Sequence, residues 1–190
     1  MKKINILIII ILTLGTFSHI NAQSDSYLKN RIIVEGMYLR NLGNFSDVWA
    51  NASGGYISYG IAFPEHNLLI FRLGYINNKL KDGVEYNDAS LSIIPIEIGG
   101  RYYFTNNRFM PFVQFMNGLN LISENTNLEG EKKDETLVRY AWQVGFGLTT
   151  NIINILSFDL AVNYQSNFYQ HDAMNTGFEY TVGIGIAIGN

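Results

Sequence analysis

Large apolar side chains recur at every second position in eight separate stretches of this sequence: 31–40, 55–63, 68–76, 94–104, 111–121, 137–149, 156–165 and 179–189. In the clearest stretch, 137–149, they are Val138, Tyr140, Trp142, Val144, Phe146 and Leu148. Because side chains of a strand alternate between its two sides, a period of two predicts β-strands. No stretch has a long helical period, so the pattern predicts an all-β protein.

The fifth stretch is less regular than the others. Val113, Phe115, Leu119 and Leu121 alternate with smaller or polar residues, but Asn117 falls on the apolar side. A β-bulge or a shift of register at Asn117 would explain this departure.

The connections between the eight stretches alternate in length. Three are short, at 64–67, 105–110 and 151–155, and four are longer, at 41–54, 77–90, 122–136 and 166–177. Short turns at one end and long loops at the other are typical of an outer-membrane barrel, with the turns in the periplasm and the loops outside the cell. We expect the charged segment 123–137 to be a solvated, mobile loop.

The two sides of the predicted strands differ in kind. One side carries Ile, Leu, Val, Phe, Tyr and Trp, and the other is small or polar. A soluble barrel would place the large residues inside, and this is the main alternative. Three features favour a membrane: the apolar sides hold few charges, the polar sides are rich in Gly and Ala, and aromatic residues gather near strand ends. We therefore predict an eight-stranded antiparallel up-and-down transmembrane β-barrel.

The first 22 residues have the pattern of a secretory signal peptide. A short basic start precedes an apolar run too short to span a bilayer, and Ala22 ends a small-residue cleavage site. The expected domains are a signal peptide at 1–22 and a barrel at 23–190. Removing Lys2 and Lys3 leaves 11 basic residues against 16 acidic ones, a net charge of −5, which argues against nucleic acid as a partner. There are no cysteines, so disulfides are excluded.

The sequence resembles the small eight-stranded outer-membrane barrels of the OmpA-transmembrane and OmpX type. The resemblance rests on the signal peptide, the eight alternating stretches, the turn and loop lengths, and "IPIEIGGRYYFTNNRFMPF" at 94–112, which is similar to a strand–turn–strand segment of porin-like members. It implies the outer membrane of a Gram-negative-type cell, with membrane lipid, lipopolysaccharide and the barrel-insertion machinery as partners. Many such barrels end in an aromatic residue, whereas this chain ends in Asn190.

Seven charged residues fall on the side predicted to face the barrel interior: Glu35, Arg72, Glu97, Arg101, Arg139, Asp159 and Glu179. Buried charges need partners, so we expect a salt-bridged interior network that includes Gln114 and Gln143. Counted from the turns, Arg139 and Glu179 should lie nearer the loops than the other five. The interior of eight strands is just wide enough to be filled by side chains, so a structural plug is expected, with a narrow gated ion path as the alternative.

These features predict a non-enzymatic membrane-anchored protein with a structural or surface-interaction role: envelope integrity, adhesion, or binding of an extracellular or periplasmic protein through its loops. No catalytic residue, cofactor or metal site is predicted. The alternative from another class is a lipid A-modifying hydrolase or acyltransferase, because some barrels of this type use Ser and His near the outer leaflet. Ser166, His171 and Asp172 would carry that chemistry.

Overall fold

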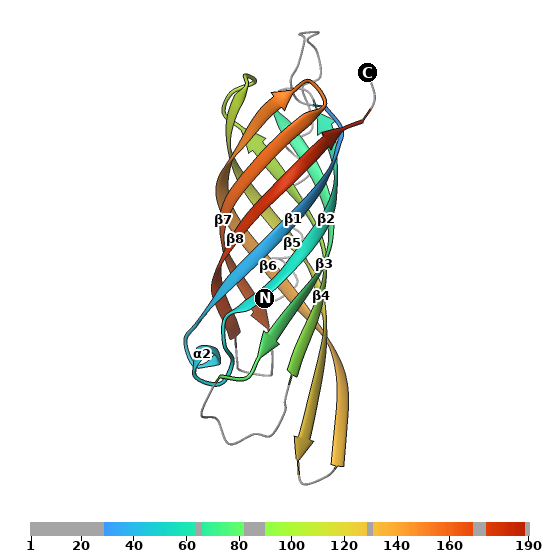
Figure 1. Cartoon of the computed structure of the whole chain (residues 1–190), viewed down its shortest axis with the longest axis vertical. Helices are drawn as coiled ribbons and strands as arrows, with labels where there is room; N and C mark the ends of the chain where they lie inside the picture. The colour runs from blue at the N-terminus through green and yellow to red at the C-terminus, as the bar shows by residue number, and fades with distance from the viewer. Residues whose placement is uncertain (1–28, 64–65, 82–89, 129–130, 169–173, 189–190) are drawn as a thin grey trace, which may run out of the picture.

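The computed structural model describes residues 29–63, 66–81, 90–128, 131–168 and 174–188. These form eight β-strands and one short helix (Figure 1): β1 Arg31–Leu42, α2 Phe45–Val48, β2 Ala52–Phe63, β3 Asn67–Lys79, β4 Ser90–Tyr103, β5 Phe109–Leu128, β6 Glu131–Ile153, β7 Leu156–Phe168 and β8 Met174–Ala187. In the described part of the chain, no helix has the length and apolar character needed to cross a membrane. The predicted signal peptide at 1–22 lies outside the described residues.

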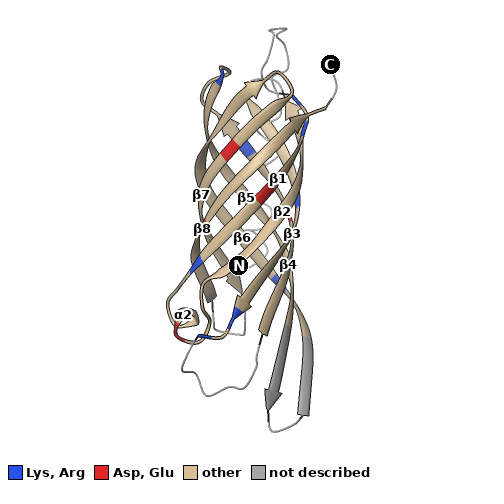
Figure 2. Cartoon of the chain, in the orientation of Figure 1, with Lys and Arg blue, Asp and Glu red and all other residues tan. Residues whose placement is uncertain are grey.

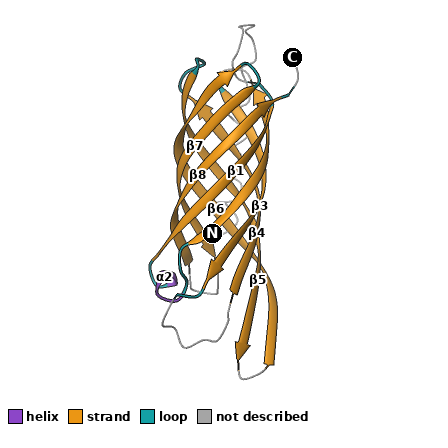
Figure 3. Ribbon diagram, in the orientation of Figure 1, coloured by secondary structure: helices purple, strands orange, loops and turns teal. Residues whose placement is uncertain are grey.

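Each strand pairs antiparallel with the next, and the last strand pairs with the first. The β1–β8 ladder joins twelve residue pairs, from Arg31 with Ala187 to Leu42 with Thr176. The sheet is therefore a closed barrel of steeply tilted strands (Figure 3). Closure satisfies the backbone hydrogen bonds that an open sheet would leave unpaired. The predicted eight-stranded antiparallel barrel is confirmed.

The two ends of the barrel differ. The β4–β5 and β6–β7 turns lie together at the top of Figure 1, where β2 ends and β3 begins, and we call this the turn end. Helix α2 and the β5–β6 hairpin lie at the opposite end, which we call the loop end. The predicted short turns thus lie at one end of the barrel and the segments predicted as longer loops at the other.

The outer surface of the barrel is apolar. Side chains such as Val34, Ile57, Leu73, Val182 and Ile184 point outward and are 48–59% exposed. In contrast, seven charged residues of the strands are buried: Arg31, Glu35, Arg72, Glu97, Arg101, Asp159 and Glu179. Figure 2 shows charged positions well within the length of the barrel. This is the reverse of a soluble barrel, in which large apolar residues fill the interior. The surface is that of a membrane-spanning barrel.

The interior is more apolar than the sequence suggests. Large buried side chains form two clusters, one near each end. The loop-end cluster consists of Met37, Leu39, Trp49, Ala52, Tyr56, Ile76, Leu91, Ile93 and Ile122. The turn-end cluster consists of Leu68, Ile70, Tyr103, Met110, Phe112, Met116 and Ala161. The expectation of a small or polar inner face therefore does not hold at these two clusters.

The β1–β2 connection closes over the loop end. Trp49 belongs to the loop-end cluster and stacks against Phe45 of α2, with ring centroids 6.2 Å apart. Backbone hydrogen bonds tie this segment to the end of β3: Ala50 N donates to Lys79 O at 2.9 Å, and Lys81 N donates to Val48 O at 3.0 Å. We call residues 43–51 the loop-end cap.

The predicted bulge at Asn117 is wrong. Asn117 pairs in regular register with Ile98 of β4 and Trp142 of β6. Its side chain remains on the outer face and donates to the carbonyl oxygen of Ile98 at 3.2 Å, so the polar group is satisfied without any distortion of the strand. The register shift of this sheet lies instead between Asn151 and Ile153, next to the β6–β7 turn.

The prediction of a loop at 123–137 is also wrong. Strands β5 and β6 stay paired through this segment, from Ser123 with Thr136 to Leu128 with Glu131. We call residues 124–135 the projecting hairpin, because Figure 1 shows its backbone continuing past the barrel. A strand that leaves the membrane has no lipid-facing side, so the alternation of large apolar residues that reveals the other strands is lost there.

Candidate functional site in the barrel interior

Arg72 lies at the centre of the barrel interior and meets three carboxylates. Its guanidinium nitrogens lie 3.2 Å from Glu35, 3.7 Å from Glu97 and 4.0 Å from Glu179. These residues come from β3, β1, β4 and β8, so strands on different sides of the barrel converge on one guanidinium. We call these four residues the Arg72 cluster. All four side chains are buried.

Neutral side chains complete the surroundings of the Arg72 cluster. Gln143 donates from Nε2 to both carboxylate oxygens of Glu97 at 2.9 Å. The hydroxyl of Tyr56 donates to Glu179 Oε2 at 2.5 Å, and Asn163 Nδ2 donates to Glu179 Oε1 at 3.0 Å. The Arg72 guanidinium also lies 4.6 Å from the centre of the Tyr56 ring, a cation–π contact.

A second ion pair lies closer to the turn end. Arg101 Nη1 is 2.8 Å from Asp159 Oδ1, and Thr149 Oγ1 donates to the same oxygen at 2.5 Å. The Arg101 guanidinium stacks 3.8 Å from the centre of the Phe112 ring in the turn-end cluster. A second buried cation, Arg31, joins the pair through Ser157: Arg31 Nη1 donates to Ser157 Oγ, which donates to Asp159 Oδ2, each at 3.3 Å.

Two amides connect the ion pair to the Arg72 cluster. Arg101 donates from Nε and Nη2 to Gln114 Oε1 at 3.1 and 3.0 Å. Gln114 Nε2 donates to Asn163 Oδ1 at 2.7 Å, and Asn163 in turn donates to Glu179. Every donor points the same way, from a cation to an anion. Aligned hydrogen bonds of this kind polarise one another, so the interior charges form one connected network.

Glycines provide the space for this network. A Cβ on Gly145 would collide with Asn163 Oδ1, and a Cβ on Gly74 would collide with the ring of Tyr56. The small residues on the inner side of the strands therefore allow the larger polar side chains opposite them to fit inside a narrow barrel.

The structure brings six of the seven predicted charged residues together inside the barrel, along with Gln114 and Gln143. Glu179, which was expected nearer the loops, lies in the Arg72 cluster. Arg139 is placed differently. It is half-buried near the loop end of β6 and donates to the carbonyl oxygen of Val138 at 3.1 Å.

Sequence analysis did not single out Tyr56 or Asn163 as members of the network. Both have the parity of the inner face, so an inward direction could be read from the alternation of their strands. Their shared partner, Glu179, could not be found from this alternation. Glu179 lies on β8 and Tyr56 lies on β2, and these two strands do not pair.

The residues of the alternative enzyme are not assembled in the described structure. His171 and Asp172 lie outside the described residues. Ser166 lies in β7 with its side chain buried. Among the residues that the structure describes, no group of His, Asp and Glu side chains could hold a metal ion.

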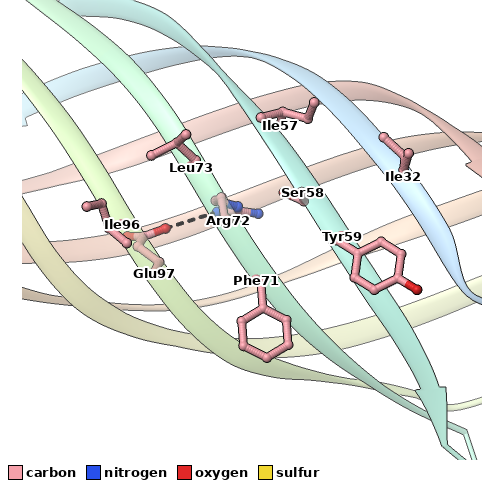
Figure 4. Close-up of a pocket in the computed structure, with 9 residues that line it drawn as sticks. All are labelled: Ile32, Ile57, Ser58, Tyr59, Phe71, Arg72, Leu73, Ile96 and Glu97. Carbon is pink, nitrogen blue, oxygen red and sulfur yellow. Dashed lines mark ion pairs between the residues drawn. The ribbon is translucent and has the colours of Figure 1, made fainter.

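A hollow of about 460 Å³ lies on the barrel wall over β1–β4 (Figure 4). Its lining includes the outward-facing Ile57, Tyr59, Phe71 and Leu73, while Arg72 and Glu97 meet behind the strands. Because this hollow opens on the apolar outer surface, it suits acyl chains and offers nothing to a polar substrate.

No family model matches the sequence, and no match was found among curated proteins. Solved structures do match. Neisserial surface protein A is 15% identical with a TM-score of 0.60, and the match covers 84% of this chain and 97% of that one. The fold is that of the small outer-membrane β-barrels.

Two further structures support this assignment of the fold. The attachment invasion locus protein Ail of Yersinia pestis is 14% identical with a TM-score of 0.55, covering 84% of this chain and 97% of that one. OprG of Pseudomonas aeruginosa is 11% identical with a TM-score of 0.56, covering 85% of this chain and 97% of that one. The predicted resemblance to this group of barrels is confirmed at the level of fold.

Proposed function

We propose that this protein is a non-enzymatic barrel of the outer membrane that anchors a binding surface outside the cell. The proposal rests on one observation: the barrel interior is filled by side chains, whereas the loop end extends beyond the barrel. The interior holds two apolar clusters with an ion network between them. Beyond the barrel, paired backbone continues into the projecting hairpin.

The filled interior favours a structural plug over a gated ion path. A conducting path must pass both apolar clusters, and the loop-end cap adds Trp49 to the outer one. Between them, the network ties β1, β3, β4, β5, β7 and β8 together through side chains. Such contacts across the barrel support a rigid anchor.

The loop end is the part suited to binding, because strands embedded in lipid leave only their ends in water. Among similar folds, Ail is described as an attachment invasion locus protein, and it has been solved in complex with the heparin analogue sucrose octasulfate. From this similarity we propose only a general role for the present protein: adhesion, or attachment of a partner, at the loop end.

The surface role is tested by shortening the projecting hairpin. Residues 124–135 are replaced by Asn-Gly, which favours a tight two-residue turn. Cells that display the full or the shortened protein are compared for attachment to immobilised heparin and to cultured cells. We expect attachment to fall with the shortened hairpin while the heat-modifiable gel band of the folded barrel persists. Equal attachment by both proteins would contradict a binding role for the hairpin.

The non-enzymatic assignment has its own test. Lipid A is analysed by mass spectrometry from cells that produce the wild-type protein, His171→Ala, or no protein. We expect one lipid A profile in all three. A modified lipid species that requires both the protein and His171 would replace this proposal with the lipid-modifying enzyme.

A further inference from the structure

Asn117 places a carboxamide on the lipid-facing side of the barrel wall, where its side chain is partly exposed. On the outer side of β5 it lies between Phe115 and Leu119, which are 41% and 49% exposed. Across the sheet it pairs with Ile98 of β4 and Trp142 of β6. These four neighbours are large and apolar, so the amide lies within the apolar surface and not at its edge.

The hydrogen bonds of this amide are incomplete. An asparagine side chain offers two N–H donors and one carbonyl acceptor. One N–H is used, because Nδ2 donates to the carbonyl oxygen of Ile98 at 3.2 Å. Within the described part of the chain, no contact satisfies the second N–H or the oxygen Oδ1. Acyl chains cannot bond to either group, so exposing them to lipid alone is costly.

We propose that Asn117 is the centre of an interface between two copies of this protein in the membrane. After the bond to Ile98, each amide keeps one donor and one acceptor, so it is complementary to a second amide of the same kind. Two copies inserted in the same direction are related by a two-fold axis along the membrane normal, which brings both amides to the same depth. Nδ2 of each copy then donates to Oδ1 of the other. A different protein would need its own amide at this depth, whereas a second copy supplies one.

The wall beside Asn117 has room for such a contact. Gly100 lies on the outer side of β4 and pairs with Phe115 of β5. A Cβ on Gly100 would meet nothing within 4 Å, so the wall is recessed at this point. An asparagine side chain is shorter than that of Phe115, so two amides meet only if the longer side chains of each copy fit into spaces on the other. Small residues permit close approach of this kind in membranes, and the recess at Gly100 provides such a space.

The interface lies on a strand that continues into the projecting hairpin. Asn117 belongs to β5, which stays paired with β6 as far as Leu128 (Figure 1). In the dimer, both projecting hairpins therefore continue from strands at the interface. Two hairpins held together bind a multivalent surface with greater avidity than one. This gain in avidity rests on the proposed function, whereas the interface itself does not.

Energy transfer between labelled copies in phosphatidylcholine vesicles tests the interface. The chain has no cysteine, so Ser123→Cys, exposed on β5, carries a donor or an acceptor dye at a single position. Transfer is measured while the protein is diluted with lipid. We expect a dimer that Asn117→Leu weakens about tenfold, the effect of losing hydrogen bonds between side chains in a bilayer. Gly100→Leu should weaken it as well. Gly36→Leu is the matched control, because Gly36 faces outward on β1, across the ring from β5, and its Cβ would meet only Val182 O at 4.0 Å.

Several outcomes would overturn the proposal. Transfer at the level of random encounters in the unsubstituted interface would leave Asn117 to lipid or to a different protein. Unchanged dimerisation of Asn117→Leu, or equal effects of Gly100→Leu and Gly36→Leu, would place any contact elsewhere. A measurement on the wild-type chain is independent of how the variants fold. Solid-state NMR of copies labelled with ¹⁵N mixed with copies labelled with ¹³C should show a contact between Asn117 Nδ2 of one copy and Asn117 Cγ of the other, and its absence overturns the interface.

Discussion

At the scale of single residues, the Arg101–Asp159 pair should be intolerant of one-sided change. Asp159→Asn leaves the buried Arg101 guanidinium without its carboxylate, and we expect a loss of about 3–5 kcal/mol in the free energy of unfolding. Arg101→Met combined with Asp159→Asn removes both charges and should cost clearly less. Urea unfolding in lipid vesicles measures both values. Equal losses would show that the charge pairing has no part in the effect.

A matched pair of glycines tests the close fit of the network. Gly145→Ala places a Cβ against Asn163, the residue that links Gln114 to Glu179, and we expect a loss of about 1–3 kcal/mol in unfolding free energy. Gly100→Ala is the control, because a Cβ there meets nothing within 4 Å and should change stability by no more than about 0.5 kcal/mol. Equal effects of the two substitutions would contradict the space argument.

The sequence reveals which way a charged residue points but not which residue it meets. Parity alone places Arg72 and Glu179 on the inner face of their strands. Their contact requires the closed ring, since β3 and β8 are not neighbours in the sheet. The inward direction of the network could therefore be predicted, whereas its division into the Arg101–Asp159 pair and the acidic Arg72 cluster could not.

At the scale of elements, the success of the sequence pattern depends on the environment of each segment. A strand in lipid has one apolar side that faces the membrane and one side that faces the barrel interior. The alternation of apolar residues therefore predicted all eight strands. The projecting hairpin has water around it and gives no such signal. Helix α2 has four residues, which is too short for a helical period to show. The loop-end cap was for that reason missed.

The loop-end cap yields a prediction of its own. Trp49→Ala empties part of the loop-end cluster, where Trp49 is 6% exposed, and should lower the unfolding free energy by about 3–5 kcal/mol. Val48→Ala, one residue away and exposed, should change it by no more than about 0.5 kcal/mol. Chemical denaturation of the two variants in the same vesicles measures the difference. A small effect at Trp49 would show that the cap does not seal the barrel.

At the scale of the whole molecule, the position of the bilayer can be tested with arginine. Val182 is half-exposed in the middle of β8, and Val182→Arg should cost about 2–4 kcal/mol because the charge would sit near the bilayer midplane. Phe104→Arg, beside the β4–β5 turn, should cost about 0–1 kcal/mol. Unfolding in vesicles compares the two. The opposite ranking would place the membrane elsewhere on the barrel.

The filled interior predicts the electrical behaviour of the protein. In planar bilayers, the wild-type barrel should show no discrete ion conductance, because apolar clusters lie at both ends of the network. Single-channel recording across a range of voltages measures this directly. Regular conductance steps that change with Glu97→Gln would instead support the gated path.

The twelve-pair ladder between β1 and β8 affects how the protein unfolds. A ring has no terminal strand from which to fray, and separating any two neighbours exposes two rows of unpaired backbone groups to lipid at once. Partial opening is therefore more costly than in an open sheet. Once assembled, the molecule should persist through a high barrier to unfolding, so its lifetime in the membrane is governed by kinetics more than by the balance of free energies.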